Sequence, residues 1–356
     1  MSTMQGRTTM QRSRIWTEID LQKEGKTTGY LRVPISTNES AYGWIPVPIA
    51  SIKNGSGPRI LLIAGSHGDE WEGQIMLIKL IQSLQSDDVR GQLIVLPGAN
   101  APAVEAGQRV SPFDHGNLNR SFPGDPNGPP TMMIAHFIET VLLPGCDLVC
   151  DFHSGGGSLE YLPSTVVVSS KSTSQLRRDL DLMRVFGLPV GFATDGSTGG
   201  DRSLTGACDR LGGIPCLSTE LGGGGTASLG LLTAAENGLA RLLHHVGLLA
   251  KAPEEPQSGS IRLLYRVQPK EFVYAPANGL FEPLVNLGDT VDDGQDAGRI
   301  HFTDEPWRKP IPVYFGVGGV VLCRRFLARA RVGDCLFNIG RIWSPDTIAD
   351  PIEQSQ

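Results

Sequence analysis

The first 250 residues alternate short apolar runs with longer stretches in which apolar positions recur at helical spacing. Continuous apolar runs predict strands buried on both faces, at 60–64, 92–96, 148–152, 166–168 and 214–219. The helical pattern predicts helices at 72–84, 131–143, 174–186 and 229–249. Strands that alternate with helices in this way predict an α/β fold, with a mostly parallel sheet flanked by helices on both faces.

Two stretches of this region lack the alternation. Residues 16–57 predict short strands and turns, because Pro34, Pro46 and Pro48 exclude a long helix there. Residues 100–130 are rich in Gly, Pro and Asn and predict a long loop. Long irregular segments of α/β enzymes often bind ligands.

The pattern changes after residue 250. A polar stretch with prolines predicts a linker over 251–260. Residues 261–343 carry frequent glycines and alternating Val, Ile and Phe without a helical pattern, so they predict a small all-β domain. The predicted organisation is an N-terminal β segment over 1–45, an α/β domain over 46–250, the linker, the β domain and a tail over 344–356.

Composition excludes several classes of protein. The 356 residues carry a formal net charge of -6 without a basic stripe, which argues against a nucleic-acid partner. No apolar run approaches the ~20 residues of a membrane span, and residues 1–15 lack the apolar core of a signal peptide. None of the six cysteines forms a Cys-x-x-Cys pair, so we expect reduced thiols in a cytoplasmic protein.

Potential metal ligands follow two of the predicted strands. His67 and Glu70 come directly after the strand at 60–64, and His153 ends the strand at 148–152. The carboxyl ends of parallel strands meet at one edge of a sheet, so these side chains can converge. Imidazole nitrogen and carboxylate oxygen suit Zn²⁺, and three protein ligands leave a position for water. A bound water of this kind has its pKa lowered toward ~7.

A structural interpretation competes with the metal site. Glu70 could simply favour the N-terminus of a helix, and a single histidine is more often a hydrogen-bonded residue than a ligand. The combined placement favours one metal ion per chain. The helix-borne His-Glu-x-x-His motif is absent, and Co²⁺, Mn²⁺ or Fe²⁺ remain alternatives to zinc.

Further polar residues are placed to serve such a site. Glu220 ends the strand at 214–219 and could move a proton between water and a leaving amine, or could instead fix the glycine loop that follows. The loop segment Asn117-Leu-Asn119-Arg120 offers an arginine fork and amides that suit a carboxylate. Arg109, in the same loop, could stabilise an oxyanion.

Two aspartates could orient the ligands. Asp151 precedes His153 by two residues and therefore shares its face on a strand, from which it could hold the imidazole. Asp69, between the two ligands of the first loop, could act in the same way.

Taken together, these segments resemble the succinylglutamate desuccinylase/aspartoacylase family of the zinc carboxypeptidase superfamily. The matching segments, in family order, are 65–70, 117–124, 151–155 and 219–220. The resemblance implies a zinc-carboxypeptidase-like fold over 46–250 and hydrolysis of an N-acyl amino acid. It also implies a role for each candidate: His67, Glu70 and His153 bind zinc, Glu220 is the general acid/base, Asn119 and Arg120 hold the substrate carboxylate, and Arg109 polarises the scissile carbonyl.

The chain departs from the better-known members of this family. It has Asp69 where they often have Asn, Asn117 where they often have Asp, and a longer spacing between Arg109 and Arg120. The segments 69–74 and 109–114 look closer to a bacterial branch that resembles N-alpha-acetyl-diaminobutyrate deacetylase. A substrate of that type has an extra amino group, which would favour an acidic residue in the pocket.

The C-terminal region resembles a biotinyl/lipoyl-like barrel without the modified lysine. The glycine-rich turn at 316–319, where a carrier domain has its lysine, contains none. We therefore expect this domain to narrow access to the metal. Two other functions remain open: a zinc carboxypeptidase acting on peptide termini, and a metal-free metabolite-binding protein. A homo-oligomer is compatible with the sequence.

Overall fold

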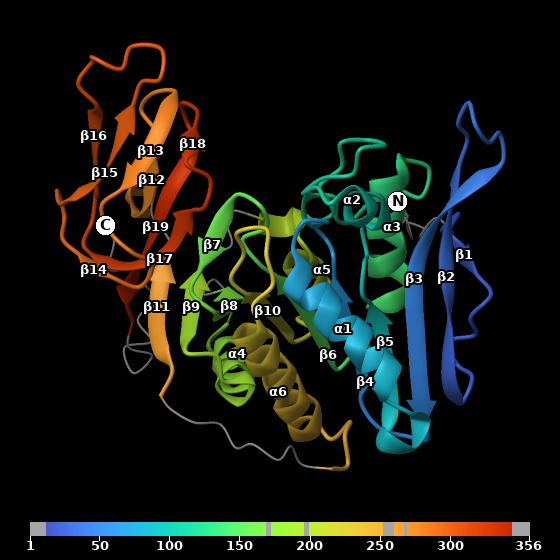
Figure 1. The fold of residues 1–356 in the computed structure, drawn as a ribbon. Coiled ribbons are helices and arrows are strands. Elements are labelled where there is room, and N and C mark those ends of the chain that lie inside the picture. Colours follow the sequence, from blue (N-terminus) through green and yellow to red (C-terminus); the bar gives the residue numbers. More distant parts are fainter. Residues whose placement is uncertain (1–11, 169–171, 196–198, 252–259, 267–268, 344–356) are drawn as a thin grey trace, which may run out of the picture.

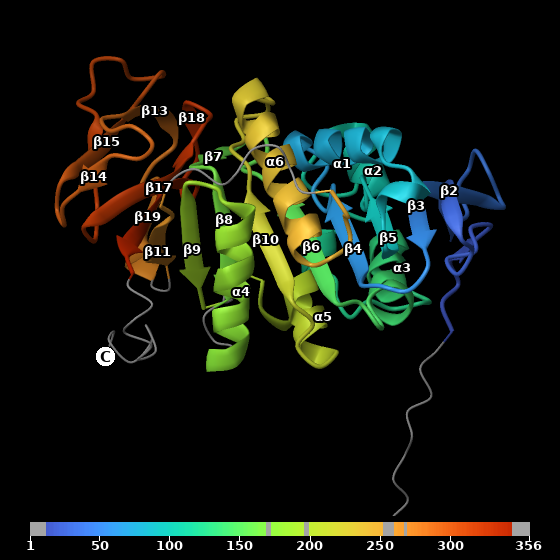
Figure 2. The same cartoon turned by 90° about the horizontal axis from the view of Figure 1, so that it is seen from below.

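A computed structural model describes residues 12–168, 172–195, 199–251, 260–266 and 269–343. The predicted tail at 344–356, the first 11 residues of the N-terminal segment and most of the predicted linker lie outside the described residues. Figure 1 shows the N-terminal hairpin and the C-terminal strands at opposite ends of one long sheet, and the view in Figure 2 agrees.

One large sheet contains strands from both the N-terminal and the C-terminal regions of the described chain. Its strands follow the order β1-β2-β3-β5-β4-β6-β10-β8-β9-β11-β19-β17-β14, with β12 paired to β19 and β7 paired to β17. The strands of the α/β region are β1 Trp16–Thr17, β2 Gly25–Ile35, β3 Gly43–Asn54, β4 Arg59–Ala64, β5 Gly91–Leu96, β6 Leu148–His153, β7 Leu159–Tyr161, β8 Ser164–Val168, β9 Val190–Thr194 and β10 Cys216–Glu220.

Parallel pairing is confined to the centre of this sheet. β4 pairs in parallel with β5 and β6, β6 with β10, and β9 with β8 and β11. The pairs β2/β3, β3/β5, β8/β10 and β11/β19 are antiparallel. The sheet is therefore mixed, and the expected parallel arrangement holds for the strands around the candidate ligands.

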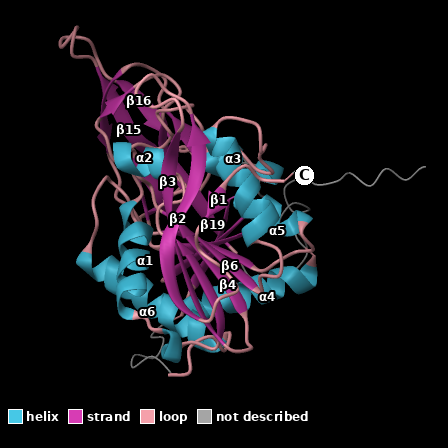
Figure 3. Cartoon of the chain, turned by 90° about the vertical axis from the view of Figure 1, so that its right-hand side faces the viewer, coloured by secondary structure: helices cyan, strands magenta, loops and turns pink. Residues whose placement is uncertain are grey.

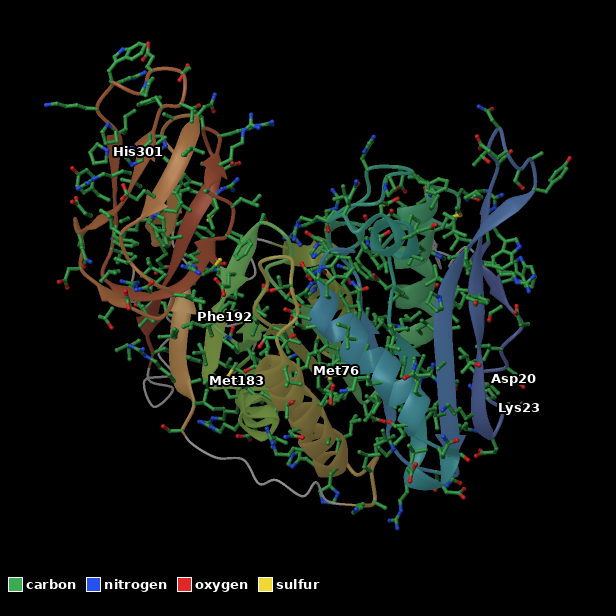
Figure 4. The ribbon with its side chains drawn as sticks, viewed as in Figure 1. Asp20, Lys23, Met76, Met183, Phe192 and His301 are labelled. Atoms are coloured by element: carbon green, nitrogen blue, oxygen red, sulfur yellow. The ribbon has the colours of Figure 1, made fainter. Side chains whose placement is uncertain are left out.

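Helices cover both faces of the central strands (Figure 1). The described helices are α1 Trp71–Ser83, α2 Ala101–Ala106, α3 Pro130–Phe137, α4 Thr173–Phe186, α5 Leu204–Arg210 and α6 Leu229–His245. Residues of α1, α4 and α6 share one buried cluster with β4, β6 and β10, which includes Met76 and Met183, labelled in Figure 4. Residues of α3 and α5 belong to a second cluster on the opposite face.

The sequence pattern missed several of these elements. The predicted loop over 100–130 contains α2, and neither β9 nor α5 was predicted. The short strands expected over 16–57 are instead two strands of 11 and 12 residues, because β2 and β3 pair along their whole lengths. β3 also crosses residue 45, the expected end of the N-terminal segment.

The C-terminal region is all-β, as expected, and it is joined to the main sheet. Figure 3 shows its strands β15 and β16 grouped at one end of the molecule. The strands are β11 Arg262–Arg266, β12 Phe272–Tyr274, β13 Gly279–Pro283, β14 Thr290–Val291, β15 Asp296–His301, β16 Ile311–Tyr314, β17 Gly319–Arg325, β18 Arg329–Ala330 and β19 Cys335–Ile342. A separate four-stranded sheet has the order β16-β15-β13-β18, and residues of the two sheets enclose a buried cluster.

Two pairings connect this region to the α/β region. β11 lies parallel to β9, and β17 lies antiparallel to β7. Among the described helices, none is long and apolar enough to cross a membrane.

Candidate metal centre and active site

The loop between β4 and α1 carries His67 and Glu70. Gly65 adopts a φ of +69°, which turns the chain sharply out of the buried strand. Gly68 lies against α2, and a Cβ built on it would be 1.9 Å from the carbonyl oxygen of Ala103. Glu70 immediately precedes α1, so the helix begins directly after the second candidate ligand. The third candidate, His153, is the last residue of β6, next to β4.

Three candidate ligand side chains converge at this edge of the sheet. One donor atom from each of His67, Glu70 and His153 lies within 4.8 Å of the others, and all three residues are buried. His67 Nδ1 is 2.7 Å from Glu70 Oε1, and His153 Nδ1 is 2.8 Å from Glu70 Oε2. Both imidazoles therefore direct the same nitrogen toward the carboxylate.

Neighbouring side chains fix which imidazole nitrogen faces inward. His67 Nε2 lies 3.1 Å from Asn117 Oδ1, and His153 Nε2 lies 2.8 Å from Asp151 Oδ2. Both oxygens can accept a hydrogen bond from Nε2, so with a metal bound each Nε2 would carry the proton and each Nδ1 would present its lone pair to the metal. Asp151 therefore contacts His153, and its orienting role stays a prediction. Asn117, predicted to bind substrate, contacts a candidate metal ligand.

The charges of these residues depend on one another. Burial raises the pKa of Glu70, but the two neighbouring histidines outweigh it and hold that pKa well below the usual range. Burial lowers the pKa of His153, but Asp151 and Glu70 raise it well above its ordinary value. A buried carboxylate facing two imidazole nitrogens is a donor set that suits a divalent cation, so these residues fit the implied zinc ion.

A cavity of about 540 Å³ opens beside the three candidate ligands. Glu220, at the end of β10, lines it together with His153. One carboxylate oxygen of Glu220, Oε2, is buried and has no hydrogen-bond partner among the described residues. Burial and the negative charge of Glu70 raise the pKa of Glu220 to about 7. A carboxyl group of this pKa can both accept and donate a proton near neutral pH.

The two loop arginines lie on the metal side of this cavity. Arg109 Nη1 is 3.3 Å from Glu70 Oε1 and 3.4 Å from His67 Nδ1, and its side chain is 49% exposed. Burial lowers the pKa of Arg120, and the nearby Arg109 lowers it further. Arg120 Nη1 donates to the carbonyl oxygen of Asn119.

The amide of Asn119 is engaged within the protein. Its Oδ1 accepts from the backbone N–H of Leu204, and its Nδ2 lies 3.0 Å from His153 Nε2. Asn119 therefore ties the loop and the start of α5 to the candidate metal ligands, and both Asn119 and Arg120 line the cavity.

Two acidic residues join the loops around the ligands. Asp69 Oδ2 accepts a hydrogen bond from the backbone N–H of Gly157, so it connects the first ligand loop to the loop after β6. Glu72, on α1, is 1% exposed, and burial raises its pKa to about 7. Asp69 thus contacts the loop that follows β6, and its predicted orienting role stays a prediction.

Other residues of the cavity were not predicted from the sequence. Tyr161 from β7 and Phe192 from β9 line it, together with five residues of the C-terminal region: Arg266, Phe272, Tyr274, Cys335 and Asn338. A charged residue that ends an otherwise apolar run, as Arg266 does after Leu263, Leu264 and Tyr265, is the signal that could have identified the arginine.

The chain is similar in sequence to known proteins. Residues 56–246 match the family model described as the succinylglutamate desuccinylase/aspartoacylase catalytic domain. The chain is 38% identical over 332 residues to the N-alpha-acetyl-L-2,4-diaminobutyric acid deacetylase of Halomonas elongata, covering 91% of this chain and 94% of the relative.

Solved structures resemble the whole described fold. The product-bound ectoine utilization protein EutE (DoeB) from Ruegeria pomeroyi has a TM-score of 0.88 at 34% identity, with 93% of this chain and 100% of that chain covered. A succinylglutamate desuccinylase/aspartoacylase from Rhodobacter sphaeroides has a TM-score of 0.87 at 35% identity, with the same coverage.

Proposed function

Because the chain belongs to the succinylglutamate desuccinylase/aspartoacylase family, we propose that it is a zinc-dependent amidohydrolase of small N-acyl amino acids. The observation that carries this proposal is the convergence of His67, Glu70 and His153 beside a cavity into which Glu220 directs a carboxylate. The relative that deacetylates a diaminobutyric acid supports an N-alpha-acetyl-diaminobutyrate-type substrate.

The protein would hold the metal through three protein ligands. His67 and His153 offer Nδ1, and Glu70 offers a carboxylate oxygen. A zinc ion held in this way supplies a water of lowered pKa and polarises a carbonyl oxygen. Asn117 and Asp151 keep the imidazoles in the tautomer that leaves each Nδ1 unprotonated.

Proton transfer is assigned to Glu220. Its unpartnered oxygen and its pKa of about 7 allow it to take a proton from the attacking water. The same carboxyl group then donates that proton to the leaving nitrogen, so that the amide bond breaks to a carboxylate and a free amine. Arg109, close to the metal ligands, is positioned to stabilise the oxyanion of the scissile carbonyl.

Substrate binding is assigned to the loop before α3. Arg120 is the cation of this loop that lines the cavity. We propose, as the sequence predicts, that Asn117, Asn119 and Arg120 together hold the carboxylate of the substrate. The amides of Asn117 and Asn119 already contact the candidate ligands, so in this interpretation Arg120 provides the direct contact with an anion. The expected barrel of the C-terminal region would narrow the cavity through Phe272 and Asn338.

The proposal is tested by metal analysis and a change at Glu220. Purified protein should contain about one zinc per chain and release amine from N-alpha-acetyl-diaminobutyrate. Glu220→Gln should retain the metal and lose roughly 100- to 10,000-fold in kcat, because proton transfer is removed while the ligands stay intact. Glu105→Gln, at an exposed position of α2, is the matched control and should keep full activity.

Other outcomes distinguish the alternatives. A protein that takes up no zinc from supplemented medium yet binds the amino acid would be a metabolite-binding protein. Faster cleavage of dipeptides than of N-acetyl and N-succinyl amino acids would indicate a carboxypeptidase. Full activity in Glu220→Gln would contradict the acid/base assignment.

A further inference from the structure

The backbone that follows Glu220 is bound to the short strand β7. Residues 222–225, which we call the glycine loop, come directly after Leu221. The carbonyl oxygen of Gly222 accepts a hydrogen bond from the N–H of Tyr161 at 3.0 Å. The N–H of Gly224 donates to the carbonyl oxygen of Leu159 at 2.9 Å. Because Glu220 Oε2 has no hydrogen-bond partner among the described residues, the position of this carboxylate depends on the backbone that carries it.

β7 lies between the glycine loop and the C-terminal region. Glu160, the middle residue of β7, forms an antiparallel bridge with Gly223 on one edge and pairs with Arg324 of β17 on the other. Figure 1 shows β7 beside β17. The glycine loop, β7 and β17 are therefore three neighbouring segments joined by backbone pairing. A shift of β7 against β17 would move the backbone that follows Glu220.

An ion pair joins the side chains of the two paired strands. Arg324 Nη2 and Nε lie 2.8 Å and 2.9 Å from Glu160 Oε2, and both side chains are half-buried. β7 has only three residues, so few backbone pairs hold it and a charged cross-strand pair contributes a large share of what fixes its position. Leu159 and Tyr161 line the cavity, whereas Glu160 and Arg324 do not. The ion pair therefore acts on the site without touching a substrate.

The residue after β17 makes a second contact with the same loops. The N–H of Phe326 donates to the carbonyl oxygen of Ser158 at 2.9 Å. A Cβ built on Gly224 would lie 2.8 Å from two ring atoms of Phe326, so the aromatic ring lies directly against the glycine loop. The end of β17 thus contacts both segments that surround the backbone after Glu220.

These contacts give the C-terminal region a role in catalysis that rests on the proposed function of Glu220 as general acid/base. A catalytic group must be held within about 0.5 Å of its productive position, and a displacement of about 1 Å can reduce the rate roughly 100-fold. We propose that Glu160 and Arg324 form a positioning pair, which fixes Glu220 from the C-terminal region through β7 and the glycine loop.

The test reverses each charge and then exchanges the two. Arg324→Glu and Glu160→Arg should each lower kcat for N-alpha-acetyl-diaminobutyrate about 5- to 30-fold, because like charges would then face each other across β7 and β17. KM and the zinc content should change little. The double variant Glu160→Arg/Arg324→Glu restores the attraction and should recover most of kcat. Asp181→Arg, which breaks an exposed ion pair with Arg184 on α4, is the matched control and should keep the kcat of wild type.

Combination with the Glu220 variant separates positioning from a general structural role. In a protein that already carries Glu220→Gln, Arg324→Glu should cause little further loss of kcat, because the pair acts through a carboxylate that is already absent. A full further loss, a double exchange no more active than the single variants, unchanged kcat in both reversals, or loss of zinc in parallel with activity overturns the inference.

Neutral variants keep the test decisive if the charge reversals fail to fold. Glu160→Gln and Arg324→Gln remove the attraction without adding repulsion, and each should lower kcat by a smaller factor at unchanged KM. Wild-type kcat in both neutral variants also overturns the inference. The proposed function fails by a different result, which is full activity in Glu220→Gln alone.

Discussion

At the scale of single residues, Glu72 shows how a buried acid beside the candidate metal ligands makes the stability of the fold depend on pH. It is 1% exposed, and one of its carboxylate oxygens has no hydrogen-bond partner among the described residues. Burial raises its pKa from an ordinary value of 4.5 to about 7, against opposing hydrogen bonds from its own backbone and from Ser154. The folded protein therefore binds a proton at Glu72 between these two pH values, whereas the unfolded chain has released it.

This difference predicts a pH-dependent effect of Glu72→Gln in the metal-free protein. A folded-state pKa above the unfolded one makes the unfolding free energy fall as pH rises from about 4.5 to about 7. Glutamine mimics the protonated acid and removes this loss. Wild type and variant should be equally stable at pH 4.5, and the variant should be more stable by about 2 to 3 kcal/mol at pH 8.

Urea unfolding of chelator-treated protein at the two pH values measures this difference. Glu105→Gln, the exposed control, should show the same offset from wild type at both. An offset for Glu72→Gln that does not change with pH would contradict the coupling.

The sequence pattern predicts the position of the candidate ligands and Glu220, but it does not predict the cavity residues from the C-terminal region. His67, Glu70, His153 and Glu220 follow strands of the parallel centre, so their common edge could be predicted from the order of apolar runs. Arg266 reaches the cavity only because β11 pairs with β9, a strand that the apolar pattern did not reveal. No local signal specifies that pairing, since it joins segments about 70 residues apart.

At the scale of elements, the close approach of two loops positions the first pair of ligands. Gly68 donates its N–H to the carbonyl oxygen of Gln108 at 2.9 Å, and its Cα faces the carbonyl of Ala103 in α2. Helix α2 occupies part of the stretch that sequence composition assigned to a loop. Its six residues carry too little periodicity to predict a helix, and contact with the ligand loop adds to its stability.

Gly68→Ala should therefore disturb both the fold and the ligands. The added Cβ would lie 1.9 Å from the Ala103 carbonyl oxygen, so α2 or the ligand loop must move. We expect a loss of about 3 kcal/mol in unfolding free energy and weaker zinc binding. Gly230→Ala, where an added Cβ meets nothing within 4 Å in α6, is the control and should cause no loss. Urea midpoints and zinc titration measure both effects, and a Gly68→Ala protein with normal values would show that the contact is dispensable.

At the scale of the whole molecule, the buried core continues across the predicted linker. One cluster combines Tyr161, Val190 and Phe192 with residues of the C-terminal region: Leu264, Val320, Leu322 and Cys323. The sequence predicted a domain boundary at 251–260 because the amino-acid composition changes there. Local composition does not show which distant strands share a sheet. The pairing of β9 with β11 could therefore not be predicted from the sequence.

This continuity predicts that the two regions unfold together. Separating them would break the β9/β11 and β7/β17 pairs and expose the shared cluster, so neither region is expected to remain folded alone. Calorimetry of the full chain should show one transition, with a ratio of van't Hoff to calorimetric enthalpy near one. A chain ending at residue 258 should bind a hydrophobic dye and lose hydrolysis, because it lacks β11 and Arg266. Two resolved transitions, or a truncated chain that is folded and active with an unchanged substrate range, would instead support an independent β domain without a role in the cavity.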